Sequence, residues 1–124
     1  MAGGKSWSAF YPLNIRAAKN VVDGDEETLR ELFQIFLEHL PEQLEQLQTA
    51  VEKNDGKNTR FYAHQIKGAM RNFAAETACT KAYTLEKAGN ENRMNDTREL
   101  FGILSGEIEV VKNYIEKGGW KKYF

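Results

Sequence analysis

The chain has 124 residues, 41% of them hydrophobic and 28% charged, which is enough for one domain with a proper core and too short for two. Its 17 basic and 18 acidic residues leave a net charge of −1, which argues against nucleic acid or an anionic membrane as a partner. No apolar run has the length of a membrane span or of a signal-peptide core, and Cys79 has no second cysteine to pair with. We therefore expect a cytoplasmic protein.

The apolar residues have helical spacing almost throughout the chain. A short first helix is expected after Pro12, before the break at Asp23-Gly24-Asp25, which also offers an N-cap for the next helix. The strongest stripe covers residues 26–53, where Pro41 is expected to kink the helix or to split it at Leu40. The apolar positions of this stripe are Leu29, Leu32, Phe33, Phe36, Leu37, Leu40, Leu44, Leu47 and Val51.

Two further helices are predicted after the turn signal Asn54-Asp55-Gly56. The first covers about residues 59–74. The second covers residues 77–88, and Gly89-Asn90 is expected to end it as a C-terminal stop.

The last long helix is expected to begin at Asp96, with Glu99 three residues on as in a capping box, and to end near Gly118-Gly119. Four amphipathic helices with short connections predict an all-α fold, an antiparallel four-helix bundle with an additional short N-terminal helix. The expected parts are an N-terminal extension, the bundle and a C-terminal tail, at residues 1–12, 13–117 and 118–124. The tail is either loosely attached or packed on the bundle through Trp120 and Phe124.

His64 is predicted to lie on the polar side of its helix. On a helical wheel the core stripe of this helix, Ile66, Met70 and Phe73, falls on the side opposite to His64, which is therefore expected to face solvent. Lys67, Gly68 and Arg71 follow three, four and seven residues later on the same side. Glycine in a helix interior costs roughly 1 kcal/mol relative to alanine, so Gly68 indicates a requirement other than helix stability.

Two cations beside a histidine are useful if the histidine must hold an anion. Lys67 and Arg71 would stabilise a phosphoryl group on the imidazole of His64, and Gly68 would leave room for a partner to approach. From spacing alone, such a face is more commonly an ordinary solvated surface. The other histidine, His39, lies on a different helix without further ligands for a metal site.

The stretch Ala63-His64-Gln65-Ile66-Lys67-Gly68 resembles the Ala-His-x-Leu-Lys-Gly motif of histidine-containing phosphotransfer (HPt) domains of two-component phosphorelays. Leu85-Glu86 matches the Leu-Glu of the family's next helix, and the resemblance covers residues 13–115. The chain departs from the family pattern at Ala74, where the family usually has glycine, and at Arg71, which is bulkier than usual. Ala74 is expected to lengthen the helix or to alter its turn into the next.

The resemblance implies that His64 accepts a phosphoryl group from a receiver-domain aspartyl phosphate, or from a kinase, and relays it to a response-regulator receiver. Lys67 and Arg71 would assist. The protein would be a phosphocarrier without ATP-dependent kinase activity, with receiver domains and a sensor or hybrid histidine kinase as partners. The polar face with a single site favours a monomer that meets these partners transiently. It would need no cofactor of its own, since Mg²⁺ would belong to the partner receiver.

The partner receiver is expected to dock over His64, using Gly68 and exposed apolar residues of the first two helices. The residues expected to contribute are Ile15, Ala18 and Phe36 or Leu40. The alternative is an HPt-like adaptor that binds receiver or kinase domains without being phosphorylated. A helical-bundle enzyme or metal protein is disfavoured, because the Glu-x-x-His pattern of such proteins is absent.

Overall fold

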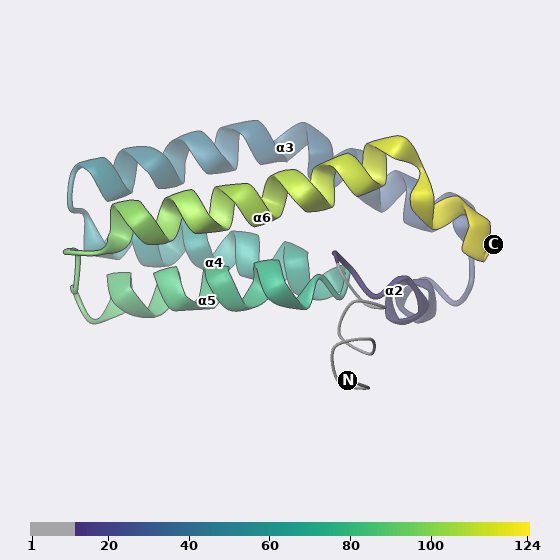
Figure 1. The fold of residues 1–124 in the computed structure, drawn as a ribbon, viewed down its shortest axis with the longest axis horizontal. Coiled ribbons are helices and arrows are strands. Elements are labelled where there is room, and N and C mark those ends of the chain that lie inside the picture. Colours follow the sequence, from purple (N-terminus) through teal and green to yellow (C-terminus); the bar gives the residue numbers. More distant parts are fainter. Residues whose placement is uncertain (1–11) are drawn as a thin grey trace, which may run out of the picture.

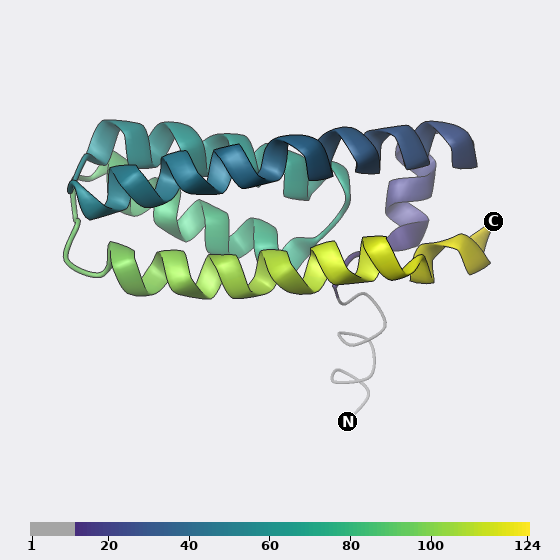
Figure 2. The same ribbon diagram turned by 90° about the horizontal axis from the view of Figure 1, so that it is seen from above.

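The computed structural model describes residues 12–124, so the expected N-terminal extension lies, except for Pro12, outside the described residues. All the regular structure of residues 12–124 is helical, which confirms the all-α prediction. The elements are α2 (Ile15–Val21), α3 (Glu26–Glu52), α4 (Gly56–Asn72), α5 (Glu76–Asn90), α6 (Thr97–Lys117) and the 3₁₀ helix η1 (Gly119–Tyr123). Helices α3 to α6 lie side by side as a bundle, and α2 lies across one end of it (Figures 1 and 2).

Polar residues at the helix starts fix most of the boundaries. The side chains of Asn14, Asp25 and Asp55 accept hydrogen bonds from backbone N–H groups in the first turns of α2, α3 and α4. The capping box expected at the start of α6 is wrong, because the Asp96 side chain makes no capping hydrogen bond. Instead, the Thr97 hydroxyl donates to the backbone carbonyl of Met94 at 2.9 Å.

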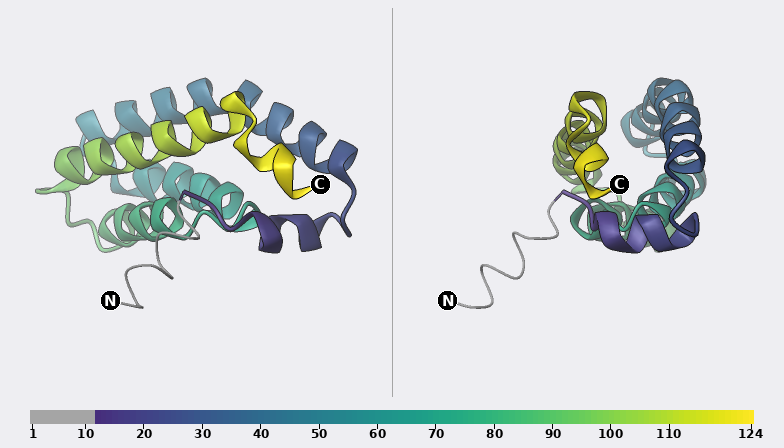
Figure 3. Two further views of the ribbon diagram at one scale, coloured as in Figure 1. Left: turned by 45° about the vertical axis from the view of Figure 1, so that its right-hand side comes forward. Right: turned by 90° about the vertical axis from the view of Figure 1, so that its right-hand side faces the viewer.

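Helix α3 continues through Pro41 as one element of 27 residues, so the expected split at Leu40 is wrong (Figure 3). Pro41 is exposed. Its missing N–H and its ring therefore disturb only the outer side of the helix, where water can satisfy the carbonyl group left without a donor.

Gly89 lies inside α5 and does not end it, which corrects the expected boundary. A Cβ atom at Gly89 would lie 2.7 Å from the backbone nitrogen of Arg60 and 2.8 Å from the carbonyl oxygen of Gly56. The glycine is therefore needed for close contact between α5 and the start of α4. Helix α4 begins earlier than expected, at Gly56 instead of about residue 59, directly after its N-cap Asp55.

The residues expected to offer a docking surface on the first two helices are in the core. Ile15, Ala18 and Phe36 are 5%, 0% and 6% exposed, and Leu40 is buried as well. The expectation that they are exposed is therefore wrong. Helix α2 lies across the end of the bundle, and this packing buries the apolar side of α2 and the facing residues of α3.

The C-terminal residues pack on the same end of the bundle (Figures 1 and 3). Gly118 ends α6 with a left-handed backbone, φ 73°, and η1 then turns Trp120 into the core, where it is 2% exposed. The indole contacts the ring of Phe33 at a centroid distance of 5.2 Å and donates to the carbonyl of Ile115 at 3.1 Å. Of the two alternatives for the tail, the structure has the packed one.

The turn between α4 and α5 is tight. The N–H groups of Ala75 and Ala74 donate to the carbonyls of Met70 and Arg71, which is the Schellman pattern of a helix end. Ala74 has φ 53°, in the left-handed region that favours glycine. The alanine does not lengthen α4. It adopts the backbone conformation for which the family's usual glycine is suited, and α5 folds back antiparallel to α4.

Candidate functional site

His64 lies in the middle of α4 with its side chain 61% exposed, on the side away from the core, as its position on the helical wheel predicts. The preceding Ala63 and the following Ile66 are fully buried and fix the rotation of the helix. The imidazole is therefore presented outward from a rigid element and not from a loop.

Glu86 on α5 joins His64 to Lys67. Its Oε2 lies 3.0 Å from His64 Nδ1, and its Oε1 lies 2.7 Å from Lys67 Nζ. The side chains of Glu86 and Lys67 are only 15% and 11% exposed, in contrast to His64. One carboxylate thus orients both the imidazole and the ammonium group.

The protonation of Glu86 determines which nitrogen of His64 carries hydrogen. Partial burial would raise the pKa of the Glu86 carboxyl, but hydrogen bonds from Lys67 and His64 outweigh burial and lower that pKa below its ordinary value. The carboxylate is then ionised at neutral pH and can only accept a hydrogen bond. His64 Nδ1 must therefore donate, so that the imidazole in its neutral form carries no hydrogen on Nε2.

Gly68 and Arg71, unlike Glu86, do not hold the imidazole of His64. A Cβ atom at Gly68 would meet nothing within 4 Å, so the fold itself leaves room for a side chain there. Arg71 is exposed, and its seven-residue separation places it about 10 Å further along the helix axis. It lines a separate surface hollow with Ala74 and Cys79.

Glu86 was matched to the family motif in the sequence but was not expected to contact His64. The position of the turn between α4 and α5 indicates this contact. The turn between α4 and α5 covers residues 73–75, and residues at similar distances on either side of a turn face each other in antiparallel helices. His64 and Glu86 are at such distances.

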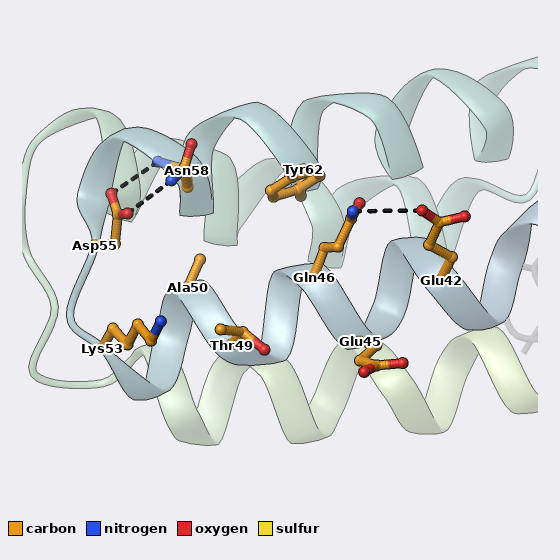
Figure 4. A pocket seen from close by; sticks show the side chains of 9 residues that line it. All are labelled: Glu42, Glu45, Gln46, Thr49, Ala50, Lys53, Asp55, Asn58 and Tyr62. Carbon is orange, nitrogen blue, oxygen red and sulfur yellow. Dashed lines mark hydrogen bonds between the residues drawn. The ribbon is translucent and has the colours of Figure 1, made fainter.

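A hollow of about 490 Å³ lies elsewhere, between α3 and α4 (Figure 4). The side chains that line it are Glu42, Glu45, Gln46, Thr49, Ala50, Lys53, Asp55, Asn58 and Tyr62, and His64 is not among them. Its Asp55 is occupied in capping α4 through Asn58. Residues 12–124 contain no group of three or more potential metal ligands, and no described helix is long and apolar enough to cross a membrane.

The family model described as Hpt domain matches residues 31–114, a segment that includes His64, Lys67 and Glu86. The chain belongs to the Hpt domain family. This confirms the resemblance, and it identifies the chain as a histidine phosphotransfer protein of the phosphorelay type. Hpt domains are phosphocarriers that exchange a phosphoryl group with receiver domains and histidine kinases.

The structure is similar to that of histidine-containing phosphotransfer protein B (HptB) from Pseudomonas aeruginosa PAO1. The TM-score is 0.78 at 20% sequence identity, covering 88% of this chain and 94% of that one. The likeness confirms the Hpt fold. The comparison with curated protein sequences gives no match.

Proposed function

We propose that His64 is the phosphorylated residue of this Hpt domain, and that Nε2 is the atom that accepts the phosphoryl group from a receiver-domain aspartyl phosphate. The observation that carries the proposal is the bond between His64 Nδ1 and Glu86, since it leaves Nε2 unprotonated on an imidazole that is 61% exposed.

In the transfer, the Nε2 lone pair attacks phosphorus while the bond from phosphorus to the aspartyl oxygen breaks. The aspartate leaves as a carboxylate, and the phosphorylated ring becomes an imidazolium whose positive charge faces Glu86. No proton has to leave Nε2, because the Nδ1 proton stays in its bond to Glu86 throughout. The reverse sequence passes the group to the aspartate of a second receiver. Such a transfer depends mainly on positioning and charge neutralisation.

Lys67 is the cation placed to assist this transfer. Its Nζ lies 2.7 Å from the same carboxylate that holds the imidazole, so the ammonium stays near the ring and can attract the phosphoryl oxygens. Arg71 would act at longer range, on a phosphoryl group or on the partner. Mg²⁺ belongs to the receiver in this proposal.

Docking over His64 is supported by the residues one turn away on either side. Gly68 presents no side chain, although the fold has space for one. Phe61, three residues before His64, is 46% exposed and offers an apolar contact on the same face. A receiver domain can therefore approach the imidazole closely, with Phe61 in place of the buried residues expected from the sequence.

The test uses the two histidines of the chain as a matched pair. A phosphorylated receiver is mixed with wild type, His64→Gln or His39→Gln. Transfer is followed by mass spectrometry, as an acid-labile, base-stable increase in mass by one phosphoryl group. We expect transfer to wild type and to His39→Gln, because His39 is exposed on a different helix, and none to His64→Gln. Transfer to His64→Gln would refute the assignment. Receiver binding by wild type without transfer would favour the adaptor alternative.

A further inference from the structure

Lys67 is enclosed far more than its neighbour His64, and two groups of α5 enclose it. Its side chain is 11% exposed although it lies on the polar side of α4. On one side, Glu86 Oε1 lies 2.7 Å from Nζ. On the other, Nζ lies 5.3 Å from the ring centroid of Tyr83, which is itself 51% exposed.

The order of Tyr83 and Glu86 along α5 determines where the Tyr83 ring lies relative to Lys67. Tyr83 precedes Glu86 by one turn, and α5 runs antiparallel to α4, so Tyr83 lies toward the C-terminal end of α4. The ammonium group of Lys67 thus has Glu86 on the side of His64 and Tyr83 on the opposite side. The ring face attracts the cation and so favours the conformation in which Lys67 stays beside Glu86.

A carboxylate alone would be an incomplete support for Lys67 during transfer. Both oxygens of Glu86 are engaged, one by His64 and one by Lys67. A phosphoryl group on Nε2 would compete with Glu86 for the ammonium group, and an aromatic face holds a cation without competing for its hydrogen bonds. The ring also keeps water from Lys67, which makes its charge more effective on a nearby anion.

We propose that Tyr83 is a positioning residue for phosphotransfer, whose ring face holds the Lys67 ammonium group against Glu86, where it stabilises a phosphoryl group on His64. This rests on the proposed function, in which His64 is the phosphorylated residue. The ring face, and not the hydroxyl group, is the part of Tyr83 that acts.

The test loads His64 with the small-molecule donor phosphoramidate and uses no receiver, so that a role of Tyr83 in docking cannot contribute. The variants are Tyr83→Phe, which keeps the ring, and Tyr83→Leu, which removes it. The control is Tyr123→Leu, which removes a similarly exposed tyrosine from η1. We expect Tyr83→Leu to slow loading by about two- to five-fold, and Tyr83→Phe and Tyr123→Leu to load like wild type.

Two further measurements separate positioning from a general structural effect. In a Lys67→Met background, Tyr83→Leu should have no additional effect on loading, because the group through which the ring acts is gone. By NMR, the protons on Cε of Lys67 should show an upfield ring-current shift in wild type and Tyr83→Phe that disappears in Tyr83→Leu. This second readout needs no phosphorylation.

The outcomes distinguish the inference from the function on which it rests. Loading of Tyr83→Leu at the wild-type rate, equal slowing in Tyr83→Phe, or slowing that persists in the Lys67→Met background would each overturn the role of the ring. Absence of the ring-current shift in wild type would overturn it as well. If no variant with His64 intact is loaded while the shift is present, the proposed function fails and the contact between Tyr83 and Lys67 stands.

Discussion

Replacing Ala74 with glycine should make the protein more stable, although the same replacement in most helical positions does the opposite. Ala74 has φ 53°, and a left-handed backbone costs a residue with a Cβ atom about 1–2 kcal/mol. Glycine avoids this cost but has a more flexible unfolded chain, which offsets about 0.4–1 kcal/mol. We expect Ala74→Gly to raise the free energy of unfolding by about 0.5–1 kcal/mol.

The measurement is urea unfolding followed by circular dichroism. The midpoint should rise without a change in the slope, because the native surface stays the same. The matched control is Ala69→Gly in the interior of α4, where the backbone is helical. This control should lower the free energy of unfolding by about 1 kcal/mol. Opposite signs for one substitution, five residues apart, would isolate the effect of the backbone angle.

An Ala74→Gly variant as stable as wild type, or less stable, would refute the reasoning. That result would mean that the backbone strain at Ala74 is no larger than the packing energy of its methyl group and the unfolded-chain entropy of glycine taken together. The turn holds Ala74 in place from outside α4 as well, since its carbonyl accepts a hydrogen bond from the N–H of Asn14 at 2.9 Å. This bond is a backbone contact and should be kept in the variant.

Three further predictions concern Gly89, Glu86 and Thr59. Gly89→Ala should lower the free energy of unfolding by about 2 kcal/mol or more, because the added Cβ would lie 2.7 Å from the backbone nitrogen of Arg60. The control Gly102→Ala, where the added Cβ meets nothing within 4 Å, should raise it by about 0.5–1 kcal/mol. Glu86→Gln should lower the free energy of unfolding by about 1 kcal/mol at pH 7. Because the pKa of Glu86 is lowered in the folded state, this difference from wild type should shrink as the pH falls below the ordinary value of 4.5. Unfolding curves at several pH values would show the change. Thr59→Val should raise the thermal midpoint, because the Thr59 hydroxyl is fully buried and has no hydrogen-bond partner among the described residues; a lower midpoint would show that the hydroxyl is satisfied.

The sequence predicted features that depend on residues close together in the chain. The cap at Asp25 and the helix end at Gly118 follow from local backbone requirements, and the structure has both. The rotation of α4 that turns His64 outward follows from the period of its apolar residues. Each of these depends on one helix alone.

The errors concern contacts between distant parts of the chain. Gly89 looks like a helix stop in the sequence, but it is a contact point with the start of α4. Ile15 and Phe36 are apolar residues that an isolated helix leaves exposed, and contacts with distant parts of the chain bury them, as the ring of Phe73 does for Phe36. The carboxylate that Lys67 shares with His64 lies on α5, and this contact depends on the register of two helices.

The burial of Trp120 gives the protein an optical probe of its own. The chain has one other tryptophan, Trp7, so Trp7→Phe would leave a single indole emitter. Native emission would then come from an apolar site against Phe33, with the cations of Arg30 and Lys121 within 6 Å of the ring, and would shift to longer wavelength when η1 leaves α3. Stopped-flow fluorescence of that variant would time the closing of this end of the bundle during folding without any added dye.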